Sequence, residues 1–295
     1  MSDLWIILTA CLVAIPCSIL GCFLVLRKMV MVGDAISHAV LPGIVIAYLI
    51  TKSFESIYMV IGAGVIGIIT TFLIEFLHKK AKVQEDASIG VTFTWMFSLG
   101  VILISVFTRG TDLDQDCVLH GEILNVPFNL WLLDNGINLG PVNVWTLGVI
   151  NVFILSFTFV FFKELYITTF DAAFATAIGI SSSLWNYLLM AAVSFVTVAS
   201  FESVGAILVI AFIVGPAATA YLLTDNLKKM LVYASSFGII SSIIGYEFAI
   251  IINGDIASSI TTIIGFFFLI TLLFAPKYGA FCSKNKLQES PSSTL

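Results

Sequence analysis

Long apolar stretches separated by short polar segments dominate the chain. A membrane-spanning helix needs about 20 mostly apolar residues. The sixth and seventh apolar stretches almost touch at Phe201–Glu202, so they form either two short helices with a tight turn or one broken element. The pattern therefore predicts an all-α, polytopic membrane protein with eight or nine transmembrane helices, and we adopt these nine: Leu4–Leu26, Gly33–Ile50, Ile57–Leu77, Ile89–Thr108, Val144–Phe162, Leu184–Ser200, Ser203–Leu223, Met230–Ile252 and Ile256–Ala275.

The composition supports a protein that lies mostly within membrane lipid. Of its 295 residues, 59% are hydrophobic and 11% are charged, and the mean hydropathy is +1.08. A soluble domain carries roughly 25% charged residues, so this composition excludes one. The lack of a basic stripe also excludes a nucleic-acid-binding protein. The first apolar run, Leu4–Leu26, is too long for a signal peptide and is predicted to be a permanent span.

The cysteines give no sign of a metal cluster or a disulfide framework. None of them forms a CxxC pair with zinc-like spacing. We interpret them as small apolar side chains: Cys11, Cys17, Cys22, Cys117 and Cys282.

Basic residues concentrate on one side of the predicted helices. With the N-terminus outside, the positive-inside rule is obeyed by eleven of the thirteen lysines and arginines: Arg27, Lys28, Lys79, Lys80, Lys82, Lys163, Lys228, Lys229, Lys277, Lys284 and Lys286. We therefore predict an outside N-terminus and an inside C-terminus. Residues 1–282 form one transmembrane domain, and residues 283–295 form a polar cytoplasmic tail that is predicted to be disordered. The longest polar break, Arg109–Asn143, then lies outside.

Ionisable side chains are rare and costly within the predicted spans. They are Asp34, His38, Glu75, Glu202 and Glu247. Glu75 precedes Lys79 by four residues at an inner helix end, which favours an ordinary surface ion pair. Glu247 either lines a polar cavity or reaches the outer interface. Glu202 is either a carboxylate exposed at a turn or a metal ligand.

Asp34 and His38 are spaced four residues apart, which places both side chains on one face of a helix. A carboxylate oxygen and an imidazole nitrogen together suit manganese, iron(II) or zinc better than calcium or magnesium. The structural alternative makes Asp34 a favourable charge at the start of a helix and His38 a packed core residue. From the spacing alone, both interpretations stay open.

Two prolines lie near the rare ionisable groups. Pro42 follows His38 by four residues and cannot donate a hydrogen bond to its carbonyl group. Pro216 has the same relation to Phe212. In lipid each freed carbonyl needs another partner, such as a cation or an ordered water. Two proline-interrupted helices therefore predict the lining of a transport pathway rather than plain anchors.

A short amphipathic segment lies on the inner side between the fifth and sixth spans. Phe170, Phe174 and Ile178 recur every four residues, and Gly179 provides a helix stop. The segment is predicted to be a helix that lies either on the membrane surface or in the groove of a cytosolic partner. The sequence contains no GxxxxGK[ST] phosphate-binding loop, so any ATP hydrolysis that drives this protein is expected on a separate chain.

Four segments resemble signatures of the ABC-3 family, the permeases of manganese, zinc and iron ABC importers. The stretch VLRKMVMVGDAISHAVLPG (Val25–Gly43) is similar to the second-helix signature, and FESVGAILVIAFIVGPAATAYLLT (Phe201–Thr224) to the second signature. The stretch FDAAFATAIG (Phe170–Gly179) resembles the cytoplasmic coupling helix, and FAPKYG (Phe274–Gly279) the usual ending. The four occur in the family's order, and the resemblance starts at about residue 4.

The sequence departs from the family pattern in the outer loop. Leu119–Glu122 has His120 where the family usually has an aromatic residue before the glycine. The role of His120 therefore stays open.

The resemblance implies a permease subunit without enzymatic activity of its own, located in the bacterial cytoplasmic membrane. It implies a second permease protomer, identical or a paralogue, with a cytosolic ATPase subunit and an extracytoplasmic metal-binding protein. Asp34 and His38 would coordinate the passing ion near the dimer axis. The metal would be cargo, with no permanently bound cofactor, and the second signature is closer to manganese and iron members than to zinc ones. The residues implied to dock the ATPase are Phe170, Asp171, Phe174, Ala175 and Gly179.

Two other classes of function compete with an ATP-driven importer. One is an ion channel or proton-coupled secondary carrier with Asp34 and Glu202 as relay groups, and the other is a membrane scaffold. Co-purification of an ATPase subunit would separate the importer from both. The residues do not identify the metal, because an aspartate and a histidine together serve several ions.

Overall fold

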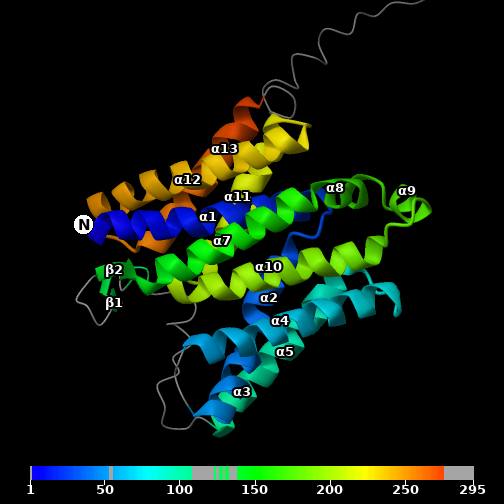
Figure 1. Cartoon of the computed structure of the whole chain (residues 1–295), viewed down its shortest axis with the longest axis horizontal. Coiled ribbons are helices and arrows are strands. Elements are labelled where there is room, and N and C mark those ends of the chain that lie inside the picture. The colour runs from blue at the N-terminus through cyan, green and yellow to red at the C-terminus, as the bar shows by residue number, and fades with distance from the viewer. Residues whose placement is uncertain are drawn as a thin grey trace, which may run out of the picture.

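The computed structural model describes residues 2–52, 56–107, 123, 126–128, 130–132 and 138–275, which are mostly helical (Figure 1). This confirms the predicted all-α fold class. The helices are α1 (Ser2–Leu26), α2 (Met31–Ala39), α3 (Leu41–Thr51), α4 (Ser56–Lys79), α5 (Glu85–Phe107), α7 (Val142–Val160), α8 (Phe162–Phe170), α9 (Ala172–Ala177), α10 (Ser182–Val204), α11 (Ala206–Leu223), α12 (Leu227–Ile252) and α13 (Ile256–Phe274).

Within the described residues, nine helical segments are long and apolar enough to cross a membrane, which confirms the predicted number. The second segment, Met31–Thr51, combines α2 and α3. The sixth and seventh spans separate at Gly205 rather than at Phe201–Glu202. Gly205 has φ of +79°, a conformation that other residues rarely adopt. The turn therefore falls at the glycine, and α10 continues through Glu202 to Val204.

The spans form two groups that are joined by α10 (Figure 1). In one group α1 contacts α7, α11 and α12, and α13 packs on α11 and α12. In the other group α2 and α3 pack against α4 and α5. Because α10 contacts both α1 and α4, it connects the two groups.

Small residues allow the closest helix contacts. A Cβ atom on Gly21 would lie 1.9 Å from the carbonyl oxygen of Ile213, so only glycine fits where α1 crosses α11. Gly43 and Gly62 allow the same close approach between α3 and α4. Such small-residue contacts drive helix association in lipid, where apolar burial against neighbouring lipid gives little advantage.

A small hairpin of two strands was not predicted. Strand β1 (Leu130–Leu132) pairs antiparallel with β2 (Asn138–Pro141), with Leu130 opposite Pro141 and Leu132 opposite Asn138. The short 3-10 helix η1 (Val126–Phe128) precedes it. Strands of three and four residues are too short to produce a clear alternating pattern in the sequence.

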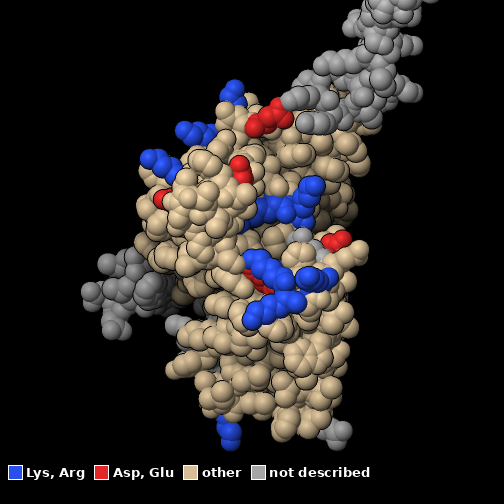
Figure 2. Space-filling model, turned by 90° about the vertical axis from the view of Figure 1, so that its right-hand side faces the viewer, with Lys and Arg blue, Asp and Glu red and all other residues tan. Residues whose placement is uncertain are grey.

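One end of the molecule, here called the basic end, carries most of the positive charge. Figure 2 shows lysine and arginine side chains gathered there. Contacts bring α8, the end of α4 and the starts of α10 and α12 together at this end: Arg27 bonds α8 and α10, Lys79 bonds Ser183, and Lys228 lies over Phe162. The N-terminus of α1 lies at the opposite end (Figure 1). The basic residues predicted to lie inside therefore gather at one end, and the N-terminus predicted to lie outside is at the other. The orientation itself stays a prediction.

Candidate functional site

Asp34 and His38 lie one turn apart on α2, and their side chains approach each other, as their spacing predicts. The distance between Asp34 Oδ1 and His38 Nε2 is 3.6 Å. Most of the remaining side chains of α2 are buried, but Asp34 is 48% exposed and His38 is 33% exposed. Helix α2 therefore turns its apolar side into the bundle and presents one acidic and one imidazole group on its accessible side.

Two aromatic rings of α5 border the imidazole of His38. Its ring centre lies 5.7 Å from that of Phe93 and 6.1 Å from that of Phe97, which it meets edge-on. These contacts restrict the orientation of the ring. They leave His38 Nε2 beside the Asp34 carboxylate, so the two candidate donor atoms are held on the same side.

The helical run is interrupted two residues after His38, at Val40. Helix α2 ends at Ala39, α3 begins at Leu41, and Val40 lies between them. Pro42 has no N–H group and cannot donate to the carbonyl oxygen of His38. The Gly43 N–H instead donates to the Val40 carbonyl at 2.9 Å. A main-chain oxygen next to the two side chains has therefore lost its usual helical donor, as predicted.

The second proline does not interrupt its helix, which corrects the prediction of a proline-broken span at Pro216. Helix α11 continues through Pro216 without a break. The carbonyl oxygen of Phe212, which Pro216 leaves without a donor, accepts a hydrogen bond from Ser18 Oγ at 3.4 Å. Phe212 is fully buried. A side chain of α1 thus satisfies this carbonyl, and the prolines of α3 and α11 have different roles.

The Asp34–His38 pair has the chemistry of an incomplete transition-metal site. Oxygen and imidazole ligands lie about 2.0 to 2.2 Å from such a cation, and donor atoms 3.6 Å apart can both reach it. In the part of the chain that the structure describes, no group of three or more His, Cys, Asp or Glu residues could hold a metal ion. Glu202 lies in the last turn of α10, and its side chain is outside that part.

Two other acidic residues of the predicted spans, Glu75 and Glu247, lie in different surroundings. Glu75 pairs with Lys79, as predicted, but Glu75 is only 5% exposed, so the predicted surface pair is wrong. The ion pair with Lys79, four residues further on the same helix, provides the buried carboxylate with an opposite charge. Glu247 is exposed on α12. Helix α12 starts at the basic end and ends at Ile252, so Glu247 lies near the end opposite the basic end.

The predicted inner helix is divided into two. Helix α8 ends at Phe170, and α9 starts after Asp171, whose Oδ1 accepts a hydrogen bond from the Phe174 N–H at 2.9 Å. Asp171 breaks the helix because its side chain caps the next one. Phe170 is therefore not on the same helix as Phe174, which corrects the prediction of one helix over residues 170–179. Gly179, with φ of +85°, ends the segment as predicted.

Helix α9 presents apolar side chains at the tip of the basic end. Phe174 and Ile178 are 53% and 49% exposed, and Ala175 is fully buried. Figure 1 places α9 beyond the ends of the neighbouring spans. Exposed aromatic and aliphatic side chains on a protruding turn are suited to insertion into a groove of a partner.

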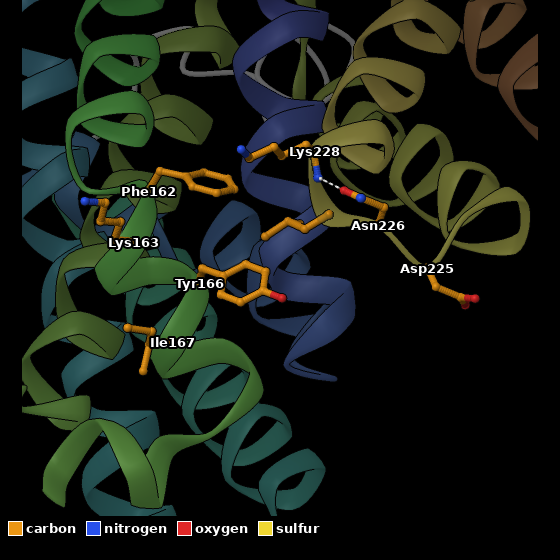
Figure 3. A pocket seen from close by; sticks show the side chains of 8 residues that line it. Phe162, Lys163, Tyr166, Ile167, Asp225, Asn226 and Lys228 are labelled. Atoms are coloured by element: carbon orange, nitrogen blue, oxygen red, sulfur yellow. Dashed lines mark hydrogen bonds between the residues drawn. The ribbon is translucent and has the colours of Figure 1, made fainter. Parts of the chain in front are cut away.

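A cleft of about 600 Å³ lies beside α8 at the same end. Its walls come from α8 and from the start of α12 (Figure 3). The Lys228 ammonium lies 5.7 Å from the centre of the Phe162 ring, and Asn226 Oδ1 accepts a hydrogen bond from the Lys228 N–H at 3.0 Å. The cleft joins the helix before α9 to α12 with a mixed aromatic and basic lining.

The sequence pattern did not single out a polar network at the basic end. Arg27 bonds two residues of α8 and one of α10. The only signal in the sequence is an arginine directly after the first span, which the positive-inside rule already explains. Its partners are separated from it by at least 141 positions, so the contacts require the fold.

Several predictions fall on residues outside the described part. They concern His120, Cys117 and most of the predicted outer loop, together with Cys282 and the tail 283–295. Of the other cysteines, Cys17 and Cys22 are buried, Cys11 is partly buried, and all three are free thiols. This confirms their interpretation as small apolar side chains.

Comparison with known proteins assigns the chain to a family. A relative from Bacillus subtilis, the manganese transport system membrane protein MntD, is 44% identical over 96% of this chain and 95% of its own length. The zinc transport system membrane protein TroD of Treponema pallidum is 42% identical over 93% of this chain and 74% of its own. A probable iron transport system membrane protein of Haemophilus influenzae is 32% identical over 93% of this chain and 90% of its own length.

A solved structure shows the same fold. PsaBC from Streptococcus pneumoniae, in complex with Fab, superposes with a TM-score of 0.77 and is 34% identical, covering 96% of this chain and 94% of that chain. The model of the ABC 3 transport family matches residues 4–275, which include α2, α9 and, apart from Asp3, the nine spans found in the described residues. The chain therefore belongs to the ABC 3 transport family, abbreviated ABC-3.

Proposed function

We propose that this chain is the membrane-spanning permease of an ATP-driven importer for manganese, iron or zinc. The observation that carries the proposal is the Asp34–His38 pair, two transition-metal donor groups 3.6 Å apart within the second of nine spans. Relatives named for manganese, zinc and iron transport support this class of cargo. Family membership and the nine apolar spans make the chain a multi-pass protein of the cytoplasmic membrane.

The pair suits a passing ion better than a resident one. A structural transition-metal site is closed by four protein ligands, whereas Asp34 and His38 supply two and remain partly exposed. A pathway must bind its ion weakly enough to release it. The His38 carbonyl oxygen and water can complete the coordination shell during passage.

A second permease protomer accounts for the exposure of the pair. A carboxylate that is 48% exposed within an apolar span is costly wherever it meets lipid. A second protomer, identical or a paralogue, that faces α2 would enclose the pair in a polar path and contribute further ligands. The ion would then cross between the two protomers.

The basic end provides the surface for a cytosolic ATPase subunit. Phe174 projects from α9, Ile178 is exposed directly after it, and the Asp171 cap fixes the start of this short helix. The cleft beside Phe162 and Lys228 extends the same surface along α8. An extracytoplasmic metal-binding protein would deliver the ion at the opposite end, where the chain begins.

Metal accumulation tests the proposal directly. Cells with and without this chain are compared for uptake of every first-row transition metal, and each comparison is repeated after ATP depletion. We expect one or two of manganese, iron and zinc to accumulate only when both the chain and ATP are present. Equal accumulation with and without the chain would refute a transport function. Uptake that persists without ATP would instead favour a secondary carrier or channel.

A further inference from the structure

Three hydrogen bonds from one guanidinium tie together two helices that flank α9. Arg27 follows the last residue of α1. Its Nε donates to Thr169 Oγ1 at 3.1 Å and its Nη2 to Thr168 Oγ1 at 3.0 Å, both on α8. Its Nη1 donates to Asn186 Oδ1 on α10 at 2.8 Å. Because α9 lies between α8 and α10 in the chain, both arms of this helical hairpin are bound to the same side chain.

The partners of Arg27 are themselves held in place. The Thr168 hydroxyl donates to the Glu164 carbonyl at 2.8 Å, and the Thr169 hydroxyl donates to the Leu165 carbonyl at 2.6 Å. Each hydroxyl hydrogen is thereby directed into its own helix, and each oxygen is available to accept from Arg27. The planar fork of arginine can serve three such acceptors at once, which a lysine ammonium cannot do with the same geometry.

The environment keeps the guanidinium charged. Burial lowers the pKa of Arg27 to about 10, and the negative charge of Glu75 opposes this shift. The group is therefore protonated at neutral pH, and all its N–H groups remain donors. Breaking these bonds would leave a partly buried charge without its partners, which is costly, so the three helices are expected to move together rather than to slide apart.

The same residue stands at the base of the helix that carries the candidate ion site. Helix α2 starts at Met31, four residues after Arg27, and bears Asp34 and His38. The connection between Arg27 and α2 is tight, since the Val32 N–H donates to the Met29 carbonyl at 3.2 Å. A displacement of the hairpin that carries α9 therefore has a short, hydrogen-bonded route to α2.

A second set of bonds fixes the other side of α10. Lys79 Nζ at the end of α4 donates to Ser183 Oγ at 2.7 Å, and the same ammonium lies 5.8 Å from the centre of the Tyr187 ring. The start of α10 thus contacts Lys79 of α4 through Ser183 and Tyr187, and it is bound through Asn186 to Arg27, which also bonds α8. Arg27 is the member of this network that reaches both arms of the hairpin.

We propose that Arg27 is a positioning residue that couples the α8–α9–α10 hairpin to α2, so that movement of α9 by the ATPase subunit shifts the Asp34–His38 pair. This inference rests on the proposed function. It assigns Arg27 no contact with the ion. Its role is to transmit a displacement of α9 to the Asp34–His38 pair on α2.

The test measures metal transport and ATP hydrolysis in the same proteoliposomes, which contain the permease, its ATPase subunit and manganese as the probe metal, supplied with the binding protein. Arg27→Gln is the main variant, and Arg27→Lys keeps the charge without the fork. Lys28→Gln is the matched control, because it removes the same charge from the adjacent, exposed residue. The quantity compared is metal transported per ATP hydrolysed.

We expect Arg27→Gln to retain its ATPase subunit and to hydrolyse ATP, but to transport at least about tenfold less metal per ATP, within the usual range of coupling effects. Arg27→Lys should be intermediate, and Lys28→Gln should match the parent protein. A merely structural role would lower the amount of folded complex and leave the ratio unchanged, which would overturn the proposal.

Variants of the partners keep the test decisive if Arg27→Gln does not fold. Thr169→Val and Asn186→Leu each remove one acceptor at nearly constant volume and leave Arg27 in place. A reduced ratio in both supports the proposal, and a parental ratio in both overturns it. If the parent vesicles transport none of manganese, iron and zinc when each is supplied in turn as the probe metal, the proposed function has failed. If the parent transports and the variants keep its ratio, only the coupling role has failed.

Discussion

The hydroxyl group of Ser18 donates to the carbonyl oxygen of Phe212, two residues that lie 194 positions apart in the chain. Within α11 this oxygen has no helical donor, because Pro216 stands four residues further on. The contact is buried on both sides, and Gly21 allows α1 to come close enough to make it. The proline of one span is thus matched by a serine of another.

This relationship predicts a stability effect that depends on the proline. Ser18→Ala should lower the free energy of unfolding in detergent by about 0.6 to 1.7 kcal/mol, the usual range for such bonds between membrane helices. In a Pro216→Ala background the main-chain N–H group restored at this position can serve the Phe212 carbonyl, so the same serine substitution should cost less. Thermal unfolding of the four proteins of the cycle measures the difference. Equal costs in both backgrounds would contradict the pairing.

The orientation of the chain gives a second prediction. Lys80 is exposed at the basic end, and Gly254 is exposed between α12 and α13. In a protein without its native cysteines, an impermeant thiol reagent should label Gly254→Cys in intact cells. It should label Lys80→Cys only after the membrane is permeabilised. The opposite result would reverse the predicted orientation, and labelling of both from outside would mean that the reagent entered the cells.

The apolar pattern predicted the number of spans because lipid imposes a length and a composition on each one. The pattern placed the break between the sixth and seventh spans at Phe201–Glu202, where polar residues begin. The structure places it at Gly205, where the backbone adopts φ of +79°. Polarity is thus a poor guide to a turn between two apolar helices, and a glycine that can adopt a left-handed conformation is a better one.

The candidate site was only partly accessible to sequence reasoning. The spacing of Asp34 and His38 predicted their proximity, because helical geometry is local. The partner of the Phe212 carbonyl and the burial of Glu75 depend on other helices, so no local pattern could reveal them. Asp171 shows an intermediate case: a residue type that favours helix caps signalled the break between α8 and α9, but the recurrence of Phe170 and Phe174 concealed it.

Docking of the ATPase subunit predicts a third effect. Phe174→Asp should leave the yield of inserted protein unchanged, since Phe174 is 53% exposed. Loss of an apolar anchor from the centre of an interface costs about 2 kcal/mol or more, which is roughly a 30-fold loss of affinity. Co-purification of the ATPase subunit from detergent measures it. Ala81→Asp in the exposed turn between α4 and α5 is the control for a carboxylate added at the basic end, and should retain the subunit.

The ion site gives the last prediction. Asp34→Asn keeps the size of the side chain but removes the charge that offsets a divalent cation, and His38→Gln replaces an imidazole nitrogen with a weaker amide ligand. Each should lower metal uptake by more than about 100-fold, since residues that only support metal ligands already cost 10- to 100-fold. Ser37→Ala is the matched control: it lies between the two on α2, and its hydroxyl bonds only the local Gly33 carbonyl at 3.0 Å among the contacts of the described chain. It should transport normally. Uptake is compared with the yield of inserted protein and of bound ATPase subunit, because a packing role for Asp34 and His38 would reduce all three together. Selective loss of uptake supports a ligand role, and normal uptake by Asp34→Asn would rule out this pair as the ion site.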